Sequence, residues 1–270
     1  LTEAGLKELA TFKNLTSFFL WREEITDRRL TVLRENNLLH KLRTATGQTG
    51  SRPAKPEDVT GIELSSTKLT DAGLKELATL QNLTYLYLSS TQVTDAGLKE
   101  LSALKHLVVL DLRSTRVADA GLKELAPLTN LTDLYLEDTL VTDKGLKALA
   151  PLTKLTTLIL SDMEVTDQTL AVLREINLLH AFHDARAANG KRPTKPEDVT
   201  TLTLARTPVT DAGLKELAPL KNLTSLNLGG TRVTDSGVKD LASFGKLTHL
   251  SLLETKVTDV GLEDLASLKN

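Results

Sequence analysis

A nine-residue phrase that returns at a fixed interval constrains the fold of this chain more than any other feature. Its fullest copies read Thr-Asp-Ala-Gly-Leu-Lys-Glu-Leu-Ala, and its acidic residue stands at Glu3, Asp27, Asp71, Asp95, Asp119, Asp143, Asp167, Asp211, Asp235 and Asp259. Most steps between these positions are 24 residues long, and two are 44. A constant interval of roughly 20–50 residues is typical of proteins built from stacked repeats. The sequence therefore predicts one array over residues 1–270 instead of separate domains.

Within each repeat the apolar spacing changes from helical to extended. Residues 71–78 place apolar side chains at i, i+3 and i+4 behind an Asp or Thr that can cap the first helical turn. Residues 83–88 alternate, so that Leu86 and Leu88 turn inward and the residues beside them turn outward. Because helices of about two turns are marginal alone, we expect each coil, one short helix and one short strand, to depend on its neighbours for burial.

The strand half of the repeat resembles the leucine-rich repeat. The segment Leu223-x-x-Leu226-x-Leu228-x-x-Thr231-x-Val233 looks like its consensus, and the helical phrase that follows is similar to ribonuclease-inhibitor-like, F-box-associated and long bacterial arrays. The resemblance implies an α/β fold, a right-handed horseshoe solenoid. It also implies a parallel sheet on the concave face, short helices on the convex face, and no cofactor. A family defined by its scaffold implies binding, and not an enzyme of any particular class.

One repeat position departs from that family. Where the family usually has a buried Asn or Cys, this chain has Thr67, Thr91, Thr115, Thr139, Thr207, Thr231 and Thr255. A buried hydroxyl needs a hydrogen-bond partner. We expect these threonines to donate to backbone carbonyls of the adjacent coil and to be structural; the alternative is a row of reactive hydroxyls.

Two helical inserts interrupt the array, at about residues 34–57 and 174–197, and they are near copies 140 residues apart. The interrupted coils also lack the Gly of the phrase, which is replaced by Arg29 and Thr169. We expect each insert to begin by extending its helix, with apolar side chains at Leu38, Leu39, Leu42, Leu178, Leu179 and Phe182 on one face. The sheet should continue while the insert bulges from the edge where strands begin. A true break between blocks is the alternative, and the inserts could be either a docking edge or a spacer.

The outward strand positions predict a binding surface on the concave face. All three Tyr and the only Trp lie there, and the candidate binding residues are Phe19, Trp21, Tyr85, Tyr87, Asp111, Arg113, Asp133, Tyr135 and Glu137. Aromatic anchors with charged neighbours are typical of protein interfaces. The excess of acids favours a protein or peptide partner that presents Lys or Arg. We expect truncation of Tyr87, Arg113 or Tyr135 to weaken binding and to leave the fold intact.

Other interpretations of the array remain open. Exposed strands favour aromatic residues even without a ligand, so the chain could be an architectural spacer or an oligomerising array. Aromatic faces near carboxylates would also suit a carbohydrate-binding module. Because Leu1 begins inside the repeat phrase and Asn270 stops just before an expected strand, we expect the chain to be a fragment of a longer array.

Composition and motifs disfavour several other functions. The net charge of −2 gives no reason to expect nucleic acid, and no apolar run approaches the roughly 20 residues of a membrane span. No phosphate-binding glycine loop or serine elbow appears, so we expect no catalytic residues. The sequence His180-x-x-His183-Asp184 has metal-ligand spacing, but the other insert lacks the second His. We therefore expect no metal, and the absence of Cys leaves the compartment open.

Overall fold

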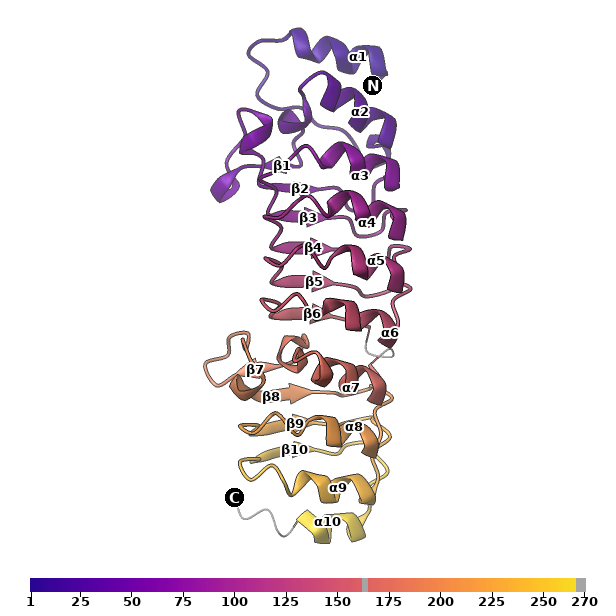
Figure 1. Cartoon of the computed structure of the whole chain (residues 1–270), viewed down its shortest axis with the longest axis vertical. Helices are drawn as coiled ribbons and strands as arrows, with labels where there is room; N and C mark the ends of the chain where they lie inside the picture. The colour runs from indigo at the N-terminus through magenta and orange to yellow at the C-terminus, as the bar shows by residue number, and fades with distance from the viewer. Residues whose placement is uncertain (162–164, 266–270) are drawn as a thin grey trace. The chain divides into compact units, whose positions relative to one another are not determined.

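The computed structural model describes residues 1–161 and 165–265 and divides the chain into two compact units. Unit 1 comprises Leu1–Val141 and unit 2 comprises Thr142–Asn270. In each unit the strands lie on one side of the stacked coils and the helices on the other (Figure 1). Across the described residues, no helix is both long and apolar enough to span a membrane.

Unit 1 has five α-helices and five strands among its described elements. The strands β2 to β5 are parallel and in sequence order, and β1 is antiparallel to β2. The elements are α1 (Glu3–Glu8), α2 (Asp27–Glu35), β1 (Ala45–Thr46), β2 (Gly61–Glu63), α3 (Asp71–Leu77), β3 (Tyr85–Tyr87), α4 (Asp95–Leu101), β4 (Val109–Asp111), α5 (Asp119–Glu124) and β5 (Asp133–Tyr135).

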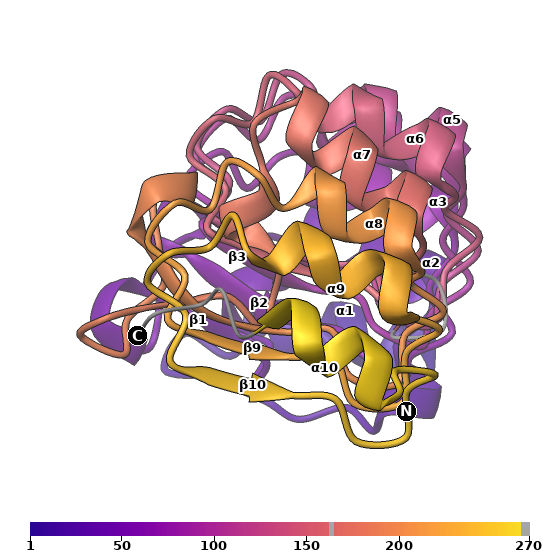
Figure 2. The ribbon, with the colours of Figure 1, turned by 90° about the horizontal axis from the view of Figure 1, so that it is seen from below.

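Unit 2 repeats this arrangement. Its strands β8, β9 and β10 are parallel, and β7 is antiparallel to β8. Seen along the stack, α8, α9 and α10 lie on the side of the coils opposite to β9 and β10 (Figure 2). The elements are α6 (Asp143–Leu146), β6 (Thr157–Ile159), α7 (Asp167–Glu175), β7 (Arg186–Ala187), β8 (Val199–Thr203), α8 (Asp211–Glu216), β9 (Ser225–Asn227), α9 (Asp235–Leu241), β10 (His249–Ser251) and α10 (Asp259–Leu265).

The core is a stack of leucine layers between the helices and the sheet. In the coil that begins with α3, the leucine and valine positions of the repeat are fully buried, at Leu74, Leu77, Leu80, Leu83, Leu86, Leu88 and Val93. Burying one such side chain contributes about 1.5–3 kcal/mol. Short helices and three-residue strands are therefore stable here because each coil covers the next, as the apolar pattern predicts.

The repeated threonines are buried, except for the partly buried Thr255, but their bonding differs from the sequence prediction. The Thr91 hydroxyl donates to the Leu88 carbonyl at 2.7 Å, and the Thr115 hydroxyl donates to the Leu112 carbonyl at 2.6 Å. The same bond recurs at Thr67, Thr139, Thr207, Thr231 and Thr255. The prediction of bonds to the adjacent coil was wrong. Each threonine reaches three residues back and closes the turn that follows its own strand.

The bonds between coils come from the aspartate of the repeat phrase. Both the backbone N–H and the hydroxyl of Thr94 donate to the Asp71 carboxylate, each at 2.7 Å. The same two bonds join Asp27 to Thr70, Asp167 to Thr210, Asp211 to Thr234 and Asp235 to Thr258. These bonds lower the pKa of Asp235. The Thr-Asp pair therefore caps its own helix and also ties that helix to its neighbour.

This aspartate explains the glycine of the phrase. A Cβ built on Gly97 would lie 2.4 Å from Asp71 Oδ1, and the glycines at 73, 121, 213, 237 and 261 meet the preceding aspartate in the same way. At Thr169, which replaces the glycine, the hydroxyl donates to the Asp143 carboxylate. Thr169 fits at the glycine position of the phrase because its side chain donates a hydrogen bond to the aspartate of the preceding phrase.

The helices that lead into the inserts, α2 and α7, are nine residues long and so are extended as expected, but they end before the apolar residues that were expected on one helical face. Helix α2 ends at Glu35 because Asn37 adopts a left-handed φ of 55°, and the Leu38 N–H then bonds to the Leu33 carbonyl at 2.7 Å. Asn177 ends α7 in the same way, with a φ of 59°. Short 3₁₀ turns follow, at Leu39–Lys41 and Leu179–Ala181.

Each insert then joins the sheet, which the sequence analysis did not foresee. The Phe18 N–H donates to the Lys41 carbonyl at 2.9 Å, the Arg43 N–H donates to the Phe18 carbonyl at 2.8 Å, and β1 pairs with β2. Insert residues therefore lie between the strand segment at Phe18 and β2, whereas α2 packs directly on α3. In unit 2 the insert pairs at Phe182 with Leu158 of β6 and through β7 with β8. The inserts add strand pairing on the sheet side and no additional α-helix on the helix side.

Candidate binding surface on the strand face

Parallel pairing brings the outward side chains of β2 to β5 into transverse rows. The first row is Gly61, Tyr85, Val109 and Asp133, and the second is Glu63, Tyr87, Asp111 and Tyr135. Neighbouring strands in a sheet lie about 4.8 Å apart. Tyrosines and carboxylates from separate coils are thus brought side by side. We call this surface the tyrosine patch, and we include in it Arg113 and Glu137, which lie just beyond the strands.

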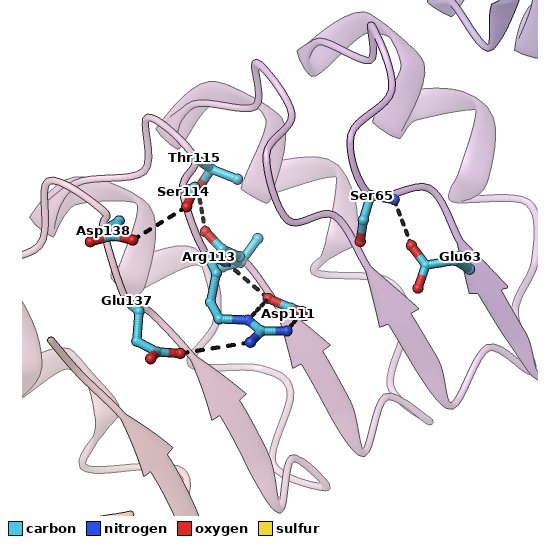
Figure 3. A network of polar contacts seen from close by, with 9 residues as sticks. Glu63, Ser65, Asp111, Arg113, Ser114, Thr115, Glu137 and Asp138 are labelled. Atoms are coloured by element: carbon cyan, nitrogen blue, oxygen red, sulfur yellow. Dashed lines mark hydrogen bonds and ion pairs between the residues drawn. The ribbon is translucent and has the colours of Figure 1, made fainter. Parts of the chain in front are cut away.

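The centre of the tyrosine patch is a fixed ion pair (Figure 3). Arg113 donates to the Asp111 carboxylate from Nε at 3.0 Å and from NH2 at 2.7 Å, and its backbone N–H also donates at 3.0 Å. The guanidinium lies over the Tyr135 ring, 5.3 Å from the centroid, and 3.9 Å from Glu137. The bond to Asp111 is the main reason that the pKa of Arg113 is raised.

These contacts change the role expected of Asp111 and Arg113. The Asp111 side chain is only 2% exposed, whereas that of Arg113 is 44% exposed. Asp111 is therefore not an accessible acid for a partner. Removing Arg113 would leave a buried carboxylate without its guanidinium, so the expectation that Arg113→Ala leaves the fold unaffected does not follow from this geometry.

The remaining carboxylates give the tyrosine patch an acidic character. Arg113, which pairs with Asp111, is the one Lys or Arg at the outward positions of the coils of β2 to β5. Glu63, Asp133 and Glu137 also occupy outward positions of these coils. Glu63 accepts from the Ser65 N–H at 2.7 Å, and Asp133 accepts from the Thr132 hydroxyl at 2.5 Å. These bonds orient the two carboxylates.

The tyrosines differ in exposure. Tyr85 is 43% exposed, and Tyr87 and Tyr135 are half-buried. Burial raises the pKa of Tyr87, and the neighbouring Tyr135 and Glu63 raise it further. The Tyr87 hydroxyl is therefore a neutral donor at physiological pH.

Phe19 and Trp21 form a second aromatic group in unit 1. Their rings make an edge-to-face pair, with centroids 5.0 Å apart, and they are 50% and 67% exposed. Arg43 of the first insert lies over the Phe19 ring at 6.0 Å. Because the insert lies between the strand segment at Phe18 and β2, these aromatics are not on a strand adjacent to the tyrosine patch. The repeat pattern did not predict that Arg43 lies over the Phe19 ring, because we expected the insert to lie outside the sheet.

The strand face of unit 2 has a different chemistry. Its paired rows read Thr201, Ser225 and His249, then Thr203, Asn227 and Ser251. These rows carry hydroxyl, amide and imidazole side chains and no tyrosine or tryptophan.

The motif that contains His180 and His183 lies in the second insert. His180 is 3% exposed, and His183 Nε2 lies 3.0 Å from the Asp184 carboxylate. In the described part of the chain no three or more His, Asp or Glu side chains gather as a metal site would require.

A family model and one solved structure support the leucine-rich-repeat fold. A family model described as "Leucine Rich repeat" matches residues 79–102, 103–126, 128–150 and 220–242. The chain is similar to an internalin (inlF) from Listeria monocytogenes, with 22% identity and a TM-score of 0.53 over 99% of this chain and 73% of that one. An internalin C2 (inlC2) from the same organism has 22% identity and a TM-score of 0.40 over 100% and 81% of the two chains. No curated protein matches the sequence at a significant level.

Proposed function

The chain is a leucine-rich-repeat protein, and we propose that it is a non-catalytic scaffold that binds a protein or peptide through the tyrosine patch of unit 1. Repeat solenoids generally use their extended strand surface to bind other proteins. The tyrosine patch is the part of the described strand face that combines aromatic anchors from several coils with oriented charges.

The observation that carries this proposal is the row Tyr87, Asp111, Tyr135 with Arg113 fixed across it. Arginine and tyrosine dominate binding hot spots, and side chains that are ordered before binding lose less entropy when a partner arrives. Arg113 carries one positive charge against the carboxylates of Asp111 and Glu137, so Glu63 and Asp133 remain to attract a partner. That balance favours a segment that presents Lys or Arg.

The test begins with a partner recovered by pull-down or from a peptide array. Tyr85→Ala, Tyr87→Ala and Tyr135→Ala should each weaken its binding by at least about tenfold, since truncating a hot-spot residue costs about 2 kcal/mol or more. Lys99→Ala and Lys123→Ala are the matched controls, because both lysines are exposed on helices. Affinities that do not differ between the two sets would refute the assignment of the tyrosine patch.

A glycan array run beside the peptide array separates the carbohydrate alternative. Binding to a glycan that depends on Phe19 and Trp21, with no peptide bound, would move the site to that aromatic pair. If the chain binds nothing on the peptide or the glycan array and assembles in a concentration-dependent way, an architectural role would be favoured.

A further inference from the structure

The second insert forms a groove on unit 2, at the edge where the strands of this unit begin. The groove has a volume of about 740 Å³ and lies between the insert and the turns that precede β9 and β10. Its polar lining includes Lys191, Arg192 and Asn189 from the insert, and Asn222, Thr224 and Lys246 from the following coils. A groove of this size accommodates several residues of a peptide.

The cations of the groove are held in place by hydrogen bonds. Lys246 Nζ donates to Asn222 Oδ1 at 2.6 Å, and Asn222 Nδ2 donates to the Glu197 carbonyl at 2.8 Å. Arg192 donates to the carbonyl of His183. Lys191 is exposed. A ligand would therefore meet ammonium groups on both the insert wall and the coil wall.

The carboxylates of the groove oppose these cations only in part. Glu197 and Asp198 both line it. However, Asp198 accepts from the Thr194 hydroxyl at 2.9 Å and from the Thr194 N–H at 3.2 Å, and these bonds lower its pKa. These bonds keep the Asp198 carboxylate charged, so three cations, Lys191, Arg192 and Lys246, face two carboxylates, and the groove lining carries one net positive charge.

The first insert shows which of these features belong to the fold. Its Arg52 donates to the Arg43 carbonyl at 2.8 Å, as Arg192 does to that of His183, so the arginine is a structural clamp in both copies. The groove lysines have no counterpart there: 140 residues earlier the chain has Ser51 and His106. The two lysines, Lys191 in the insert and Lys246 in a following coil, are thus specific to this groove and are absent from the corresponding positions of unit 1.

We propose that this groove binds an acidic peptide segment of a partner protein. Aspartate or glutamate side chains of the segment pair with Lys191 and Lys246. Asn189, Asn222 and Thr224 add neutral amide and hydroxyl groups to the lining, which suit a peptide backbone better than a simple anion. This site is independent of the tyrosine patch, since it lies on the other unit and has the opposite charge preference.

The test uses the whole chain and a fluorescent ten-residue peptide of alternating acidic and small residues, followed by fluorescence anisotropy. The double variant Lys191→Ser/Lys246→His, which installs the residues of the first insert, should lower the affinity by at least about tenfold. Lys191→Arg/Lys246→Arg should keep it. Lys99→Ala/Lys123→Ala and Tyr85→Ala should leave it unchanged, which separates this site from the tyrosine patch. Binding should weaken as NaCl rises from about 50 to about 300 mM.

A reciprocal experiment asks whether the lysines are sufficient. Ser51→Lys/His106→Lys should add a second binding site, so that the stoichiometry of the peptide rises from one to two. No binding by the unaltered chain, equal binding by Lys191→Ser/Lys246→His, or equal binding of a peptide with Gln and Asn in place of the acids would each overturn the proposal. Competition by inorganic phosphate as strong as that by the unlabelled peptide would also overturn it, because it would show a site for simple anions.

Discussion

Gly97→Ala should destabilise unit 1 by about 2–4 kcal/mol, although helix propensity predicts the opposite sign. Gly97 lies inside α4, where alanine is favoured over glycine by about 1 kcal/mol. The structure opposes this gain because the new Cβ would lie 2.4 Å from Asp71 Oδ1 and 2.9 Å from Leu74 Cδ1. The leucine methyl can shift, but the carboxylate is held by two hydrogen bonds.

The size of the effect follows from those bonds. To clear the Cβ, Asp71 must give up its contacts with the N–H and the hydroxyl of Thr94, both 2.7 Å long. A hydrogen bond to a charged group contributes about 1.5–3 kcal/mol. Losing most of two such bonds outweighs the gain of about 1 kcal/mol in helix propensity.

The measurement is urea unfolding, combined with hydrogen exchange of the amides in α3 and α4, since neighbouring repeats can open separately. Gly245→Ala is the matched control, because a Cβ there would meet no atom within 4 Å. In the background of Asp71→Ala, which itself should cost about 2–3 kcal/mol, the alanine at position 97 should be neutral or stabilising. A Gly97→Ala variant as stable as the parent chain, or additive effects of the two substitutions, would refute this account of the repeat phrase.

Three further predictions concern the inserts and the ion pair. Burial lowers the pKa of His40 and His180. The folded chain therefore binds protons at these histidines less readily than the unfolded chain does. Its stability should be full above about pH 6.5 and should fall as the pH drops below that value. Urea midpoints between about pH 7.5 and 5 should show this loss, and His40→Leu/His180→Leu should flatten it; an unchanged slope would contradict it. Arg113→Ala should lower the free energy of unfolding by about 1–2 kcal/mol, because its buried carboxylate partner loses two bonds; equal stability by urea unfolding would show that the pair contributes nothing. Limited proteolysis should cut first in the exposed segments 48–52 and 188–191, and first cuts within a 24-residue coil would speak against it.

The sequence by itself determined the repeating architecture. The 24-residue interval and its two apolar spacings placed the helices, the strands and the buried leucines, because those spacings follow from the geometry of a single helix or strand. They also placed Tyr85, Tyr87 and Tyr135 on the outward face of the strands. Such inferences need no knowledge of which coil touches which.

Tertiary structure decided every feature that depends on a contact between segments distant in the chain. The Asp71 carboxylate finds Thr94 one coil away, and this contact makes glycine necessary at position 97. The first insert pairs with Phe18 and with β2, although the sequence predicted a helical insert that bulges from the edge of the sheet. Asp111 is outward in register but is covered by Arg113 from its own coil and flanked by Tyr87 and Tyr135 from the next coils. The local spacing of apolar residues determines the direction in which a side chain points. The register and distance of the neighbouring coils determine which groups it contacts.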